Sequence, residues 1–340
     1  MSTSSAAPEI IVAPVAAPVN EAVANAVLEG LSATPKWLPA WLFYDAQGSR
    51  LFERITLLPE YYLTRTERAI FTGYSDGIIA AAIDAYATSG SRGSGKLRLL
   101  ELGAGSAAKT GVLLDAAVRY QGSTEYLPID VSETAMADAC ASIARSSNGV
   151  LVRPQVANYV TDTLSIPPHD GPTLALYIGS SIGNFAPEEA VAILQNLRAQ
   201  LRQGDTLLLG TDLVKDSAKL ISAYNDHDGV TEAFNLNILR RINRDLRANF
   251  DLAAFRHQAI WNAEQSRMEM HLQSTKAQTV RVGALRTSFS FEAGETIHTE
   301  NSYKFTQEGI RKLFADSGFQ VAHQWTDENQ WFAVTVATVA

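Results

Sequence analysis

The chain has 340 residues, of which 46% are apolar, so it is long enough for two compact units or for one unit with a large insertion. Its net charge of −8 and isoelectric point near 5.3 argue against a nucleic-acid binder, which normally carries a basic face, and against attraction to anionic membranes. The single cysteine, Cys140, allows no intrachain disulfide, which is typical of a reducing cytoplasm.

The N-terminal segment, residues 1–19, is rich in alanine, proline, serine and valine and contains no basic residue. It lacks the charged start of a signal peptide, and we predict a disordered tail. No apolar stretch approaches the length of a membrane span. The histidines show neither i, i+4 spacing nor a Cys/His cluster. We therefore expect a cytoplasmic protein without a metal site, and we expect it to act as a monomer.

The first predicted element is a helix from about Asn20 to Leu31. A second helix is predicted to begin at Thr64, because Thr64 and Glu67 have the spacing of a capping box. We expect this helix to run in two pieces to about Ala87. A loop rich in glycine and serine, Ser89–Gly95, follows it.

From Leu97 onward, short apolar runs alternate with helical runs. The predicted strands are Leu97–Leu102, a run ending at Asp130, Val150–Val156, Thr173–Ile178 and Thr206–Gly210. The predicted helices between them are Ser106–Tyr120, Ser132 to about Arg145, and Pro187–Arg202. This alternation predicts an α/β fold with a parallel, doubly wound sheet whose strands are buried on both faces.

The C-terminal segment predicts a different arrangement. A helix from about Thr306 to Ser317 precedes two strands, Phe319–Trp325 and Trp331–Val339, joined by a short polar turn. Two strands joined in this way form a hairpin, so one of them must run antiparallel to the rest of the sheet. A Rossmann-like parallel sheet closed by an antiparallel C-terminal strand is typical of class I methyltransferases, and ordinary dinucleotide-binding domains lack it.

About a quarter of the chain, between Asp212 and Asn301, is not needed for this sheet. It begins with a helical pattern, Lys215–Arg247, and then becomes strand-like in Arg267–Leu272 and Thr279–Phe291. We predict an inserted α+β unit that completes a substrate pocket. The expected division is a methyltransferase unit of residues 62–213 and 303–340, and a substrate-binding unit of residues 20–61 and 214–302.

A glycine turn, Gly103-Ala104-Gly105, follows Glu101 at the point where the first strand meets the next helix. Glycines suit this position because a bound cofactor passes close to the backbone. Two glycines alone are weak evidence, but Asp130 stands at the end of the second strand, where an acidic residue can accept hydrogen bonds from a ribose. The alternative role of Asp130 is to place a charge at a helix N-terminus.

The third glycine of the dinucleotide fingerprint is missing, and Ser106-Ala107-Ala108 stands in its place. Since S-adenosylmethionine (SAM) has no pyrophosphate, this favours SAM over a nicotinamide dinucleotide as the bound cofactor. Lys109 follows in the sequence. It is either a solvated surface lysine or the partner of the methionine carboxylate of SAM.

Distinctive strings make the sequence resemble the histidine-specific Nα-methyltransferases of ergothioneine biosynthesis. The resemblance extends from Leu31 to the C-terminus. The strings are Pro35-Lys36, Phe43-Tyr44-Asp45, Leu58-Pro59-Glu60-Tyr61-Tyr62, Thr64-Arg65-Thr66-Glu67, Glu101-Leu102-Gly103, Gly179-Ser180-Ser181-Ile182-Gly183-Asn184, Leu208 to Asp216, Ala233-Phe234-Asn235 and Thr299-Glu300-Asn301-Ser302.

The resemblance implies a free amino acid as substrate and assigns its contacts. The residues that hold the carboxylate and amino groups of the substrate are Tyr61, Asn184 and Tyr224. Tyr44 matches the tyrosine beside the nitrogen that is methylated, and Tyr44 or Asn184 would orient its lone pair. The residues that match the imidazole subsite are Glu300, Ser302 and the lining residue Met270.

The resemblance also assigns contacts with SAM. The matching residues are Gly103, Lys109 and Asp130, and we place Gly105, Tyr159 and Gly179 in the same site. One departure concerns the adenine. The family usually has Gly-Asp-Phe or Gly-Asp-Tyr after the third strand, whereas this chain has Ala157-Asn158-Tyr159. Asn158 retains a carbonyl oxygen that can accept a hydrogen bond from the adenine amino group.

Glu300 and Ser302 suit an imidazole chemically. Residues two apart on a strand face the same way, so both can address one ligand. A neutral imidazole has one N–H donor and one bare acceptor nitrogen, which a carboxylate and a hydroxyl can bind. Taken without the resemblance, these two residues fit an exposed edge strand equally well. In the same way, Tyr61 could belong to a hydrophobic staple and Tyr224 could be a half-buried helix residue.

The resulting hypothesis is SAM-dependent trimethylation of the α-amine of L-histidine to hercynine, the first step of ergothioneine biosynthesis. Three alternatives stay open. One is Nα-methylation of tyrosine or tryptophan, the second is a nicotinamide-dependent oxidoreductase, and the third is an amino-acid-binding module without catalysis. The missing third glycine and the C-terminal hairpin argue against the oxidoreductase.

Overall fold

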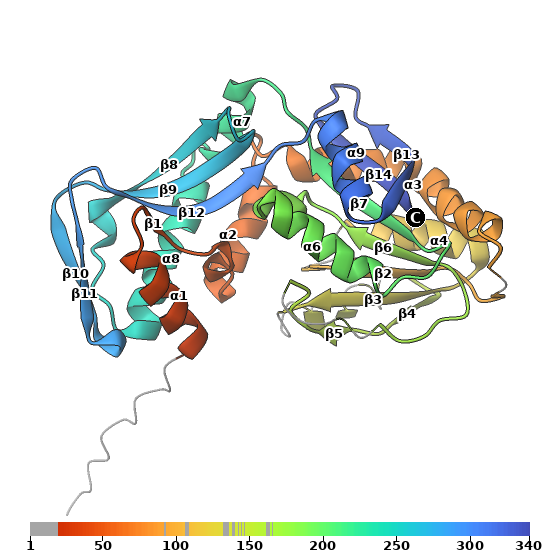
Figure 1. Cartoon of the computed structure of the whole chain (residues 1–340), viewed down its shortest axis with the longest axis horizontal. Helices are drawn as coiled ribbons and strands as arrows, with labels where there is room; N and C mark the ends of the chain where they lie inside the picture. Colours follow the sequence, from red (N-terminus) through yellow and green to blue (C-terminus); the bar gives the residue numbers. More distant parts are fainter. Residues whose placement is uncertain are drawn as a thin grey trace, which may run out of the picture.

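The computed structural model describes residues 20–91, 93–105, 109–131, 136–137, 140–141, 143, 145, 147–160, 164 and 166–340. The predicted tail, residues 1–19, lies outside them. Two β-sheets, one with eight strands and one with four, form the framework. Figure 1 shows each sheet with its own helices, so that the two units lie side by side along the longest axis of the molecule.

The larger sheet has the order β13-β14-β7-β6-β2-β3-β4, and β5 also pairs with β3. Its strands are β2 (Arg98–Leu102), β3 (Thr124–Asp130), β4 (Val150–Val152), β5 (Gln155–Val156), β6 (Thr173–Tyr177), β7 (Thr206–Asp212), β13 (Phe319–Thr326) and β14 (Phe332–Val339). Strands β2 to β7 pair in parallel. Every residue of β2, β6 and β7 is buried, as predicted for a sheet covered on both faces.

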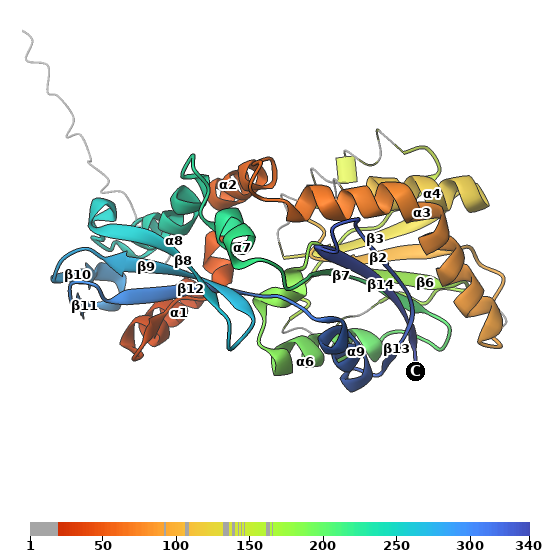
Figure 2. The ribbon, with the colours of Figure 1, turned by 90° about the horizontal axis from the view of Figure 1, so that it is seen from above.

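Helices cover the two faces of this sheet in pairs. The helices on one face are α3 (Leu63–Thr88) and α4 (Gly111–Gln121), and those on the other are α6 (Pro187–Arg198) and α9 (Gln307–Asp316) (Figure 2). Adjacent residues of β2 consequently enter different hydrophobic clusters. Leu99 belongs to the cluster that contains Leu113 of α4, and Leu100 belongs to the cluster that contains Leu194 of α6.

The C-terminal hairpin confirms the predicted change of direction. β14 pairs antiparallel with both β7 and β13, so β14 is the reversed strand and β13 runs the same way as β7. A mostly parallel sheet that ends in such a hairpin has the class I methyltransferase topology that the sequence predicts.

The smaller sheet has the order β1-β12-β9-β8. Its strands are β1 (Lys36–Trp37), β8 (Phe255–Asn262), β9 (Arg267–Ser274) and β12 (Thr296–Tyr303). The other elements of this unit are α1 (Glu21–Ser32), η1 (Ala40–Phe43), α2 (Ala46–Thr56), α7 (Ser217–Tyr224), α8 (Val230–Leu246) and the hairpin of β10 (Gln278–Val282) with β11 (Thr287–Phe291). Burial alternates along β9, because one face packs on the helices and the other does not.

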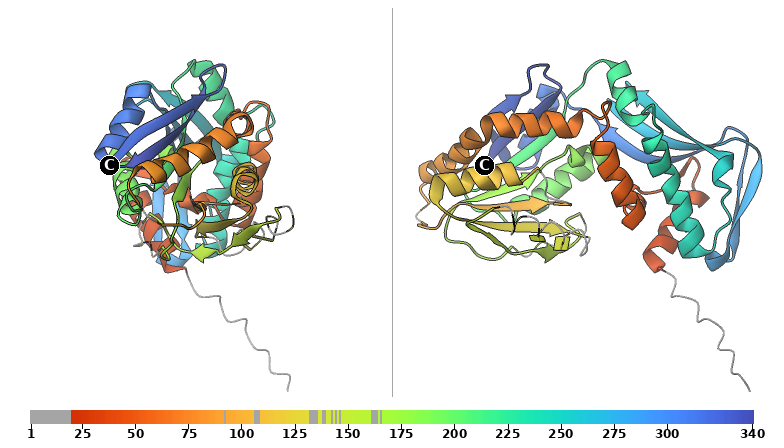
Figure 3. Two further views of the ribbon diagram at one scale, coloured as in Figure 1. Left: turned by 90° about the vertical axis from the view of Figure 1, so that its right-hand side faces the viewer. Right: turned by 180° about the vertical axis from the view of Figure 1, so that it is seen from behind.

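The chain crosses between the two units at neighbouring points. The segment after β7 and the segment after β12 run in the same direction and form a parallel bridge between Leu213 and Phe305. The view from behind in Figure 3 shows these connections between the two units. They bring the end of β7 beside the end of β12, although the two are about ninety residues apart in sequence.

The predicted capping box was wrong. α3 begins at Leu63, its N-cap residue is Tyr62, and no side chain caps it. The carboxylate of Glu67 points into the protein, where it accepts hydrogen bonds from the Gly179 amide and the Lys109 ammonium. A buried carboxylate needs such partners more than an exposed helix end needs a cap. The predicted break was also wrong, because α3 is one helix of 26 residues.

Two other predictions are settled only in part. The helix predicted from Ser106 is observed as α4, which begins at Gly111, and residues 106–108 lie outside the described part. Most of the helix predicted from Ser132 to Arg145 also lies outside it. None of the helices in the described ranges is long and apolar enough to cross a membrane.

Candidate active site

The glycine turn lies at the carboxyl end of β2, against the end of β3. Gly103 and Gly105 have φ angles of +67° and +51°, a left-handed conformation that glycine adopts without strain. The Gly105 N–H donates to Oδ2 of Asp130 at 2.9 Å, so the aspartate lies directly over the turn. A Cβ at Gly105 would meet no atom of the described residues within 4 Å, so that part of the chain leaves space above the turn.

Glu101 supports this turn from inside the protein. Its carboxylate is 2% exposed, and it accepts hydrogen bonds from Thr110 Oγ1 at 2.7 Å and from the Tyr126 hydroxyl. Burial raises the pKa of Glu101 to about 7, and these two hydrogen bonds oppose the shift. Glu101 therefore connects β2, β3 and the segment before α4 beneath the glycine turn.

Lys109 is paired within the protein. Its ammonium forms an ion pair with Glu67, whose side chain is completely buried, while the other oxygen of Glu67 accepts the Gly179 N–H at 2.7 Å. A Cβ at Gly179 would lie 3.0 Å from Lys109 Nζ. Glu67, which sequence reasoning missed as a site residue, thus joins α3 to the ends of β2 and β6.

Tyr159 brings the segment after β5 against the glycine turn. A Cβ at Gly103 would lie 3.0 Å from the Tyr159 hydroxyl, and the ring packs edge-on against Tyr177 with centroids 5.7 Å apart. In the same segment, Asn158 Oδ1 accepts the Val160 N–H at 3.1 Å. The residues placed in the SAM site therefore come together around the ends of β2, β3 and β5.

An aromatic group from the smaller unit faces this region. Tyr44 follows η1 and lies 5.9 Å, centroid to centroid, from both Phe52 and Phe234, and Tyr61 packs edge-on against Tyr224 at 6.3 Å. Tyr44 is 43% exposed over the whole residue, but protein atoms crowd its hydroxyl. Desolvation of this hydroxyl, and then the Glu300 charge, raise the pKa of Tyr44 above its ordinary value, with further contributions from Tyr61, Tyr159 and Tyr224. These interactions place tyrosines of both units, and Glu300, near one another.

A β-bulge decides where Glu300 points. β12 and β9 pair regularly up to His298, and the register then shifts by one residue, so that Glu300 lies opposite Met270 and Ser302 opposite Met268. Both methionines are buried on the helix-covered face of the sheet. The bulge therefore turns Glu300 to the buried face, whereas regular alternation would have put it on the face of His298.

Glu300 and Ser302 share this face with different partners. Glu300 is half-buried over the whole residue, desolvation of its carboxylate raises its pKa to about 7, and the positive charge of Lys304 opposes the shift. Ser302 Oγ lies 2.7 Å from the Tyr224 hydroxyl.

Asn184 is the last residue of the turn η2 (Ser181–Asn184). This turn packs closely against β12, because a Cβ added to Gly183 would lie only 2.8 Å from the Tyr303 carbonyl oxygen.

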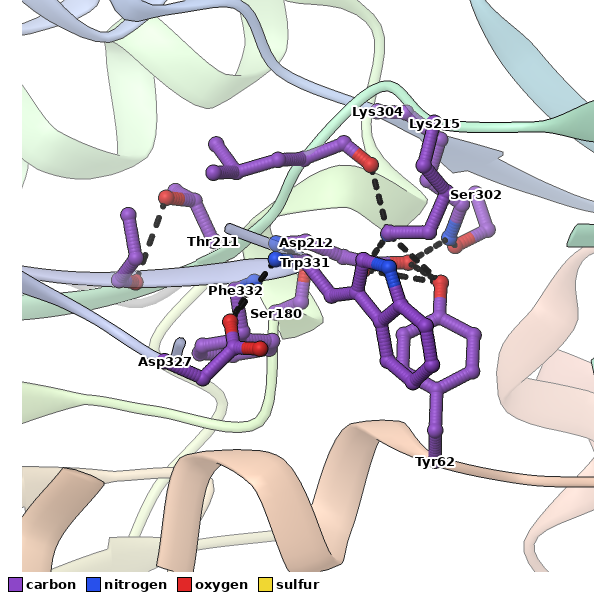
Figure 4. Close-up of polar contacts among 12 residues, drawn as sticks. Tyr62, Ser180, Thr211, Asp212, Lys215, Ser302, Lys304, Asp327, Trp331 and Phe332 are labelled. Atoms are coloured by element: carbon purple, nitrogen blue, oxygen red, sulfur yellow. Dashed lines mark hydrogen bonds and ion pairs between the residues drawn. The ribbon is translucent and has the colours of Figure 1, made fainter. Parts of the chain in front are cut away.

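Sequence reasoning missed a buried network at the crossing between the units (Figure 4). Asp212, at the end of β7, is fully buried and forms ion pairs with Lys215 at 2.5 Å and Lys304 at 2.9 Å. The Tyr62 hydroxyl donates to the same carboxylate at 2.8 Å. A charged residue at the carboxyl end of an apolar parallel strand was the available signal, because ligands bind at that edge.

A second cluster lies on the opposite face of β9 and β12. Glu269, His271 and His298 bring their ligand atoms within 4.8 Å of one another, a grouping that the sequence spacing did not indicate. The two imidazoles are stacked at 4.7 Å with an interplanar angle of 18°, so their in-plane lone pairs do not converge on one point. Glu269 is already bonded to Arg267 and His271.

The larger sheet, its reversed C-terminal strand, the glycine turn and Asp130 define a class I methyltransferase. A family model described as a histidine-specific, SAM-dependent methyltransferase matches residues 23–339. The chain therefore belongs to the family of histidine-specific, SAM-dependent methyltransferases.

Individual relatives agree with this family. Histidine N-alpha-methyltransferase of Mycolicibacterium smegmatis is 43% identical over 93% of this chain and 95% of its own length. Ergothioneine biosynthesis protein 1 of Neurospora crassa is 30% identical over 87% of this chain and 32% of its own length. Among solved structures, magnesium protoporphyrin IX methyltransferase from Synechocystis PCC 6803 with bound SAM has a TM-score of 0.43 at 12% identity, over 88% of this chain and 94% of that one.

Proposed function

We propose that this protein trimethylates the α-amine of L-histidine with SAM as methyl donor and so produces hercynine, the first step of ergothioneine biosynthesis. The observation that carries the proposal is the position of Glu300 and Ser302 on one strand face, with Tyr224 in contact with Ser302 and with Tyr44 interacting with both Glu300 and Tyr159. The names of the Mycolicibacterium and Neurospora relatives support methylation of histidine at Nα and a connection with ergothioneine biosynthesis.

The proposed division of labour follows the two units. Residues 62–213 and 303–340 would bind the methyl donor, and residues 20–61 and 214–302 would bind the amino acid. In the first unit Asp130 would accept hydrogen bonds from the ribose, Asn158 would bind the adenine amino group, and Gly103 and Gly105 would let the donor approach the backbone. The space that the described residues leave above Gly105 is compatible with such a ligand.

Around the methionine end of the donor, we propose that Lys109 pairs with the carboxylate, with Gly179 and Tyr159 beside it. Because Lys109 is already paired with Glu67, it would bind the ligand as part of that ion pair. Glu67 thereby keeps the ammonium at the edge of the sheet instead of in solvent.

In the second unit we propose separate contacts for the polar groups and for the ring of the amino acid. Tyr61, Asn184 and Tyr224 would hold its carboxylate and amino groups, and Met270 would line the ring pocket. Glu300 would accept the imidazole N–H, and Ser302 would donate to the bare ring nitrogen. A ring without these two groups would leave the buried Glu300 and Ser302 unpaired, which disfavours phenylalanine-like substrates.

The donor supplies a methyl group that is already activated by a sulfonium. The amine nitrogen would attack the methyl carbon with its lone pair as the carbon–sulfur bond breaks, giving the methylated ammonium and neutral S-adenosylhomocysteine. The protein positions the nitrogen in line and excludes water. Each round needs a neutral amine, so its proton must leave first, and we expect activity to rise with pH. Because the pKa of Tyr44 is raised, this phenol stays protonated and orients the amine, while its ring favours the growing cation.

Incubation of the purified protein with SAM and one amino acid, followed by mass spectrometry, tests the proposal. We expect mono-, di- and trimethylated histidine and stoichiometric S-adenosylhomocysteine. Parallel incubations with tyrosine and tryptophan should give at most about a hundredth of the rate, a ratio of the size that unpaired buried polar groups produce. Methylation of tyrosine or tryptophan in preference to histidine would contradict the substrate assignment and leave a different amino-acid methyltransferase.

A further inference from the structure

Lys304 is a buried lysine in contact with Ser302. Its side chain has no exposed surface. The ammonium donates to Ser302 Oγ at 2.8 Å and to the Tyr224 hydroxyl at 2.9 Å, and it lies 2.9 Å from Asp212 Oδ2. An ammonium has three donors and no acceptor, so these three partners use all of its hydrogen-bonding capacity.

The hydroxyl groups of Ser302 and Tyr224 therefore both accept from Lys304, and they also contact each other at 2.7 Å. One of them must donate to the other. A serine oxygen has two lone pairs and can accept two hydrogen bonds, whereas the second lone pair of a phenol oxygen is partly delocalised into its ring. The favoured arrangement has Tyr224 donating to Ser302, which then accepts two hydrogen bonds and keeps its own proton for a ligand. Tyr224 would then contact the substrate as an acceptor from its amino group rather than as a donor to its carboxylate.

We propose that Lys304 is a positioning residue that makes Ser302 a hydrogen-bond donor toward the unprotonated ring nitrogen of the substrate. This inference rests on the proposed function, because it assumes that histidine binds beside Ser302. The same ammonium favours the charged form of Glu300, so one buried lysine prepares both members of the imidazole subsite, the carboxylate as acceptor and the hydroxyl as donor.

Asp212, at the end of β7, holds Lys304 in this position through their ion pair. Its carboxylate is also bonded to Lys215, and Lys215 contacts Tyr62 but belongs to the crossing that follows β7 rather than to β12. Figure 4 shows both lysines converging on Asp212, with Ser302 beside Lys304. Substitution of Lys215 is therefore a matched control, since it removes the same charge from the same carboxylate, and the hydrogen bonds of Lys215 go to Tyr62, Asp212 and Leu213 rather than to Ser302.

The test compares histidine with two analogues, β-(pyrrol-2-yl)alanine and β-(pyrrol-3-yl)alanine, in each of which a ring CH replaces one nitrogen. The analogue whose ring N–H still faces Glu300 differs from histidine only in lacking the unprotonated ring nitrogen that would accept from Ser302. We expect the wild-type protein to prefer histidine over the better analogue by about 100-fold in kcat/KM. Lys304→Met should reduce this preference by about tenfold, and Lys215→Met should leave it within about twofold.

Two further variants keep the inference falsifiable. If Lys304→Met does not fold, Asp212→Asn/Lys304→Met removes both charges of the pair and serves in its place. In a Ser302→Ala background, Lys304→Met should change the preference by less than about twofold, because the hydroxyl through which it acts is gone. An unchanged preference in Lys304→Met, or an equal loss in Lys215→Met, overturns the role of Lys304. A wild-type protein that does not methylate histidine instead overturns the proposed function.

Discussion

The donor-binding edge of the larger sheet and the strand pair β9/β12 of the smaller sheet assemble their polar residues in different ways. At the donor edge, one strand, one turn and the end of the next strand bring Glu101, Gly105 and Asp130 together. At the strand pair, Glu300 and Ser302 reach the buried face only because of a bulge and depend on Lys304 and Tyr224.

This difference indicates which region can select the cofactor and which can select the substrate. The donor edge uses backbone geometry shared by many proteins that bind a nucleoside, so it defines the class of cofactor. The strand pair uses a half-buried carboxylate and a hydroxyl whose hydrogen bonds are fixed by the Asp212–Lys304 ion pair, so it is suited to reject a ring with the wrong pattern of donors and acceptors. The following experiments test whether the two regions can be perturbed separately.

The largest expected effect separates substrate binding from donor binding. Glu300→Ala should lower kcat/KM for histidine about 1000-fold, since the ring N–H loses its acceptor in a buried site. The dissociation constant for SAM, measured by calorimetry, should change less than about twofold. Glu269→Ala on the opposite face of the same strands is the control and should keep most of the activity. Equal losses of histidine and SAM binding in Glu300→Ala would show that the regions are not independent.

A pH experiment tests the burial of Glu300 without any ligand. Its pKa is about 7 in the folded protein against 4.5 in the unfolded chain, so the folded state binds more protons between these values and stability falls as pH rises through that window. Glu300→Gln removes this loss. Relative to wild type, the variant should therefore gain about 3 kcal/mol between pH 4 and pH 8 in urea unfolding.

Glu101 has a similarly raised pKa but is present in both proteins, so its contribution cancels from the comparison. A difference between variant and wild type that does not change with pH would mean that Glu300 titrates as an exposed carboxylate. The proposed selectivity of the strand pair β9/β12, which depends on a desolvated Glu300 carboxylate, would then lose its physical basis.

A smaller effect is expected at the donor edge. Asp130→Ala should raise the dissociation constant for SAM about 30-fold, or about 2 kcal/mol, because the ribose loses a charged acceptor. Histidine binding in the presence of S-adenosylhomocysteine at saturating concentration should stay within about threefold. Asp76→Ala removes an exposed aspartate of α3 and is the control. An unaltered SAM affinity in Asp130→Ala would remove this residue from the proposed donor site.

The smallest effect concerns the residue in which this chain departs from its family. Asn158→Asp places a carboxylate at the proposed adenine contact and should tighten SAM binding about fivefold, or about 1 kcal/mol, since charge-assisted hydrogen bonds are stronger than neutral ones. Calorimetry at two salt concentrations measures the change. Weaker binding in the variant would place the adenine elsewhere.

Much of the fold could be predicted from the sequence because its signals are local. The strand–helix alternation, the reversed C-terminal strand and the helical start of the insertion correspond to observed elements. The sequence also predicts that the residues around the glycine turn lie close together, since the carboxyl ends of adjacent parallel strands meet at one edge of the sheet. Local pattern misled at Thr64 and Glu67, because a capping box and a buried ion pair use the same residue types.

The sequence by itself determined the class of fold, the position of the glycine turn and the two-residue spacing that puts Glu300 and Ser302 on one side of a strand. Only the tertiary structure decided which side that is, because a one-residue bulge reverses the alternation and leaves no local signature. The tertiary structure also decided that Asp212 and Lys304 meet. Each is ordinary in its own segment, and their pairing depends on two distant chain crossings that lie side by side.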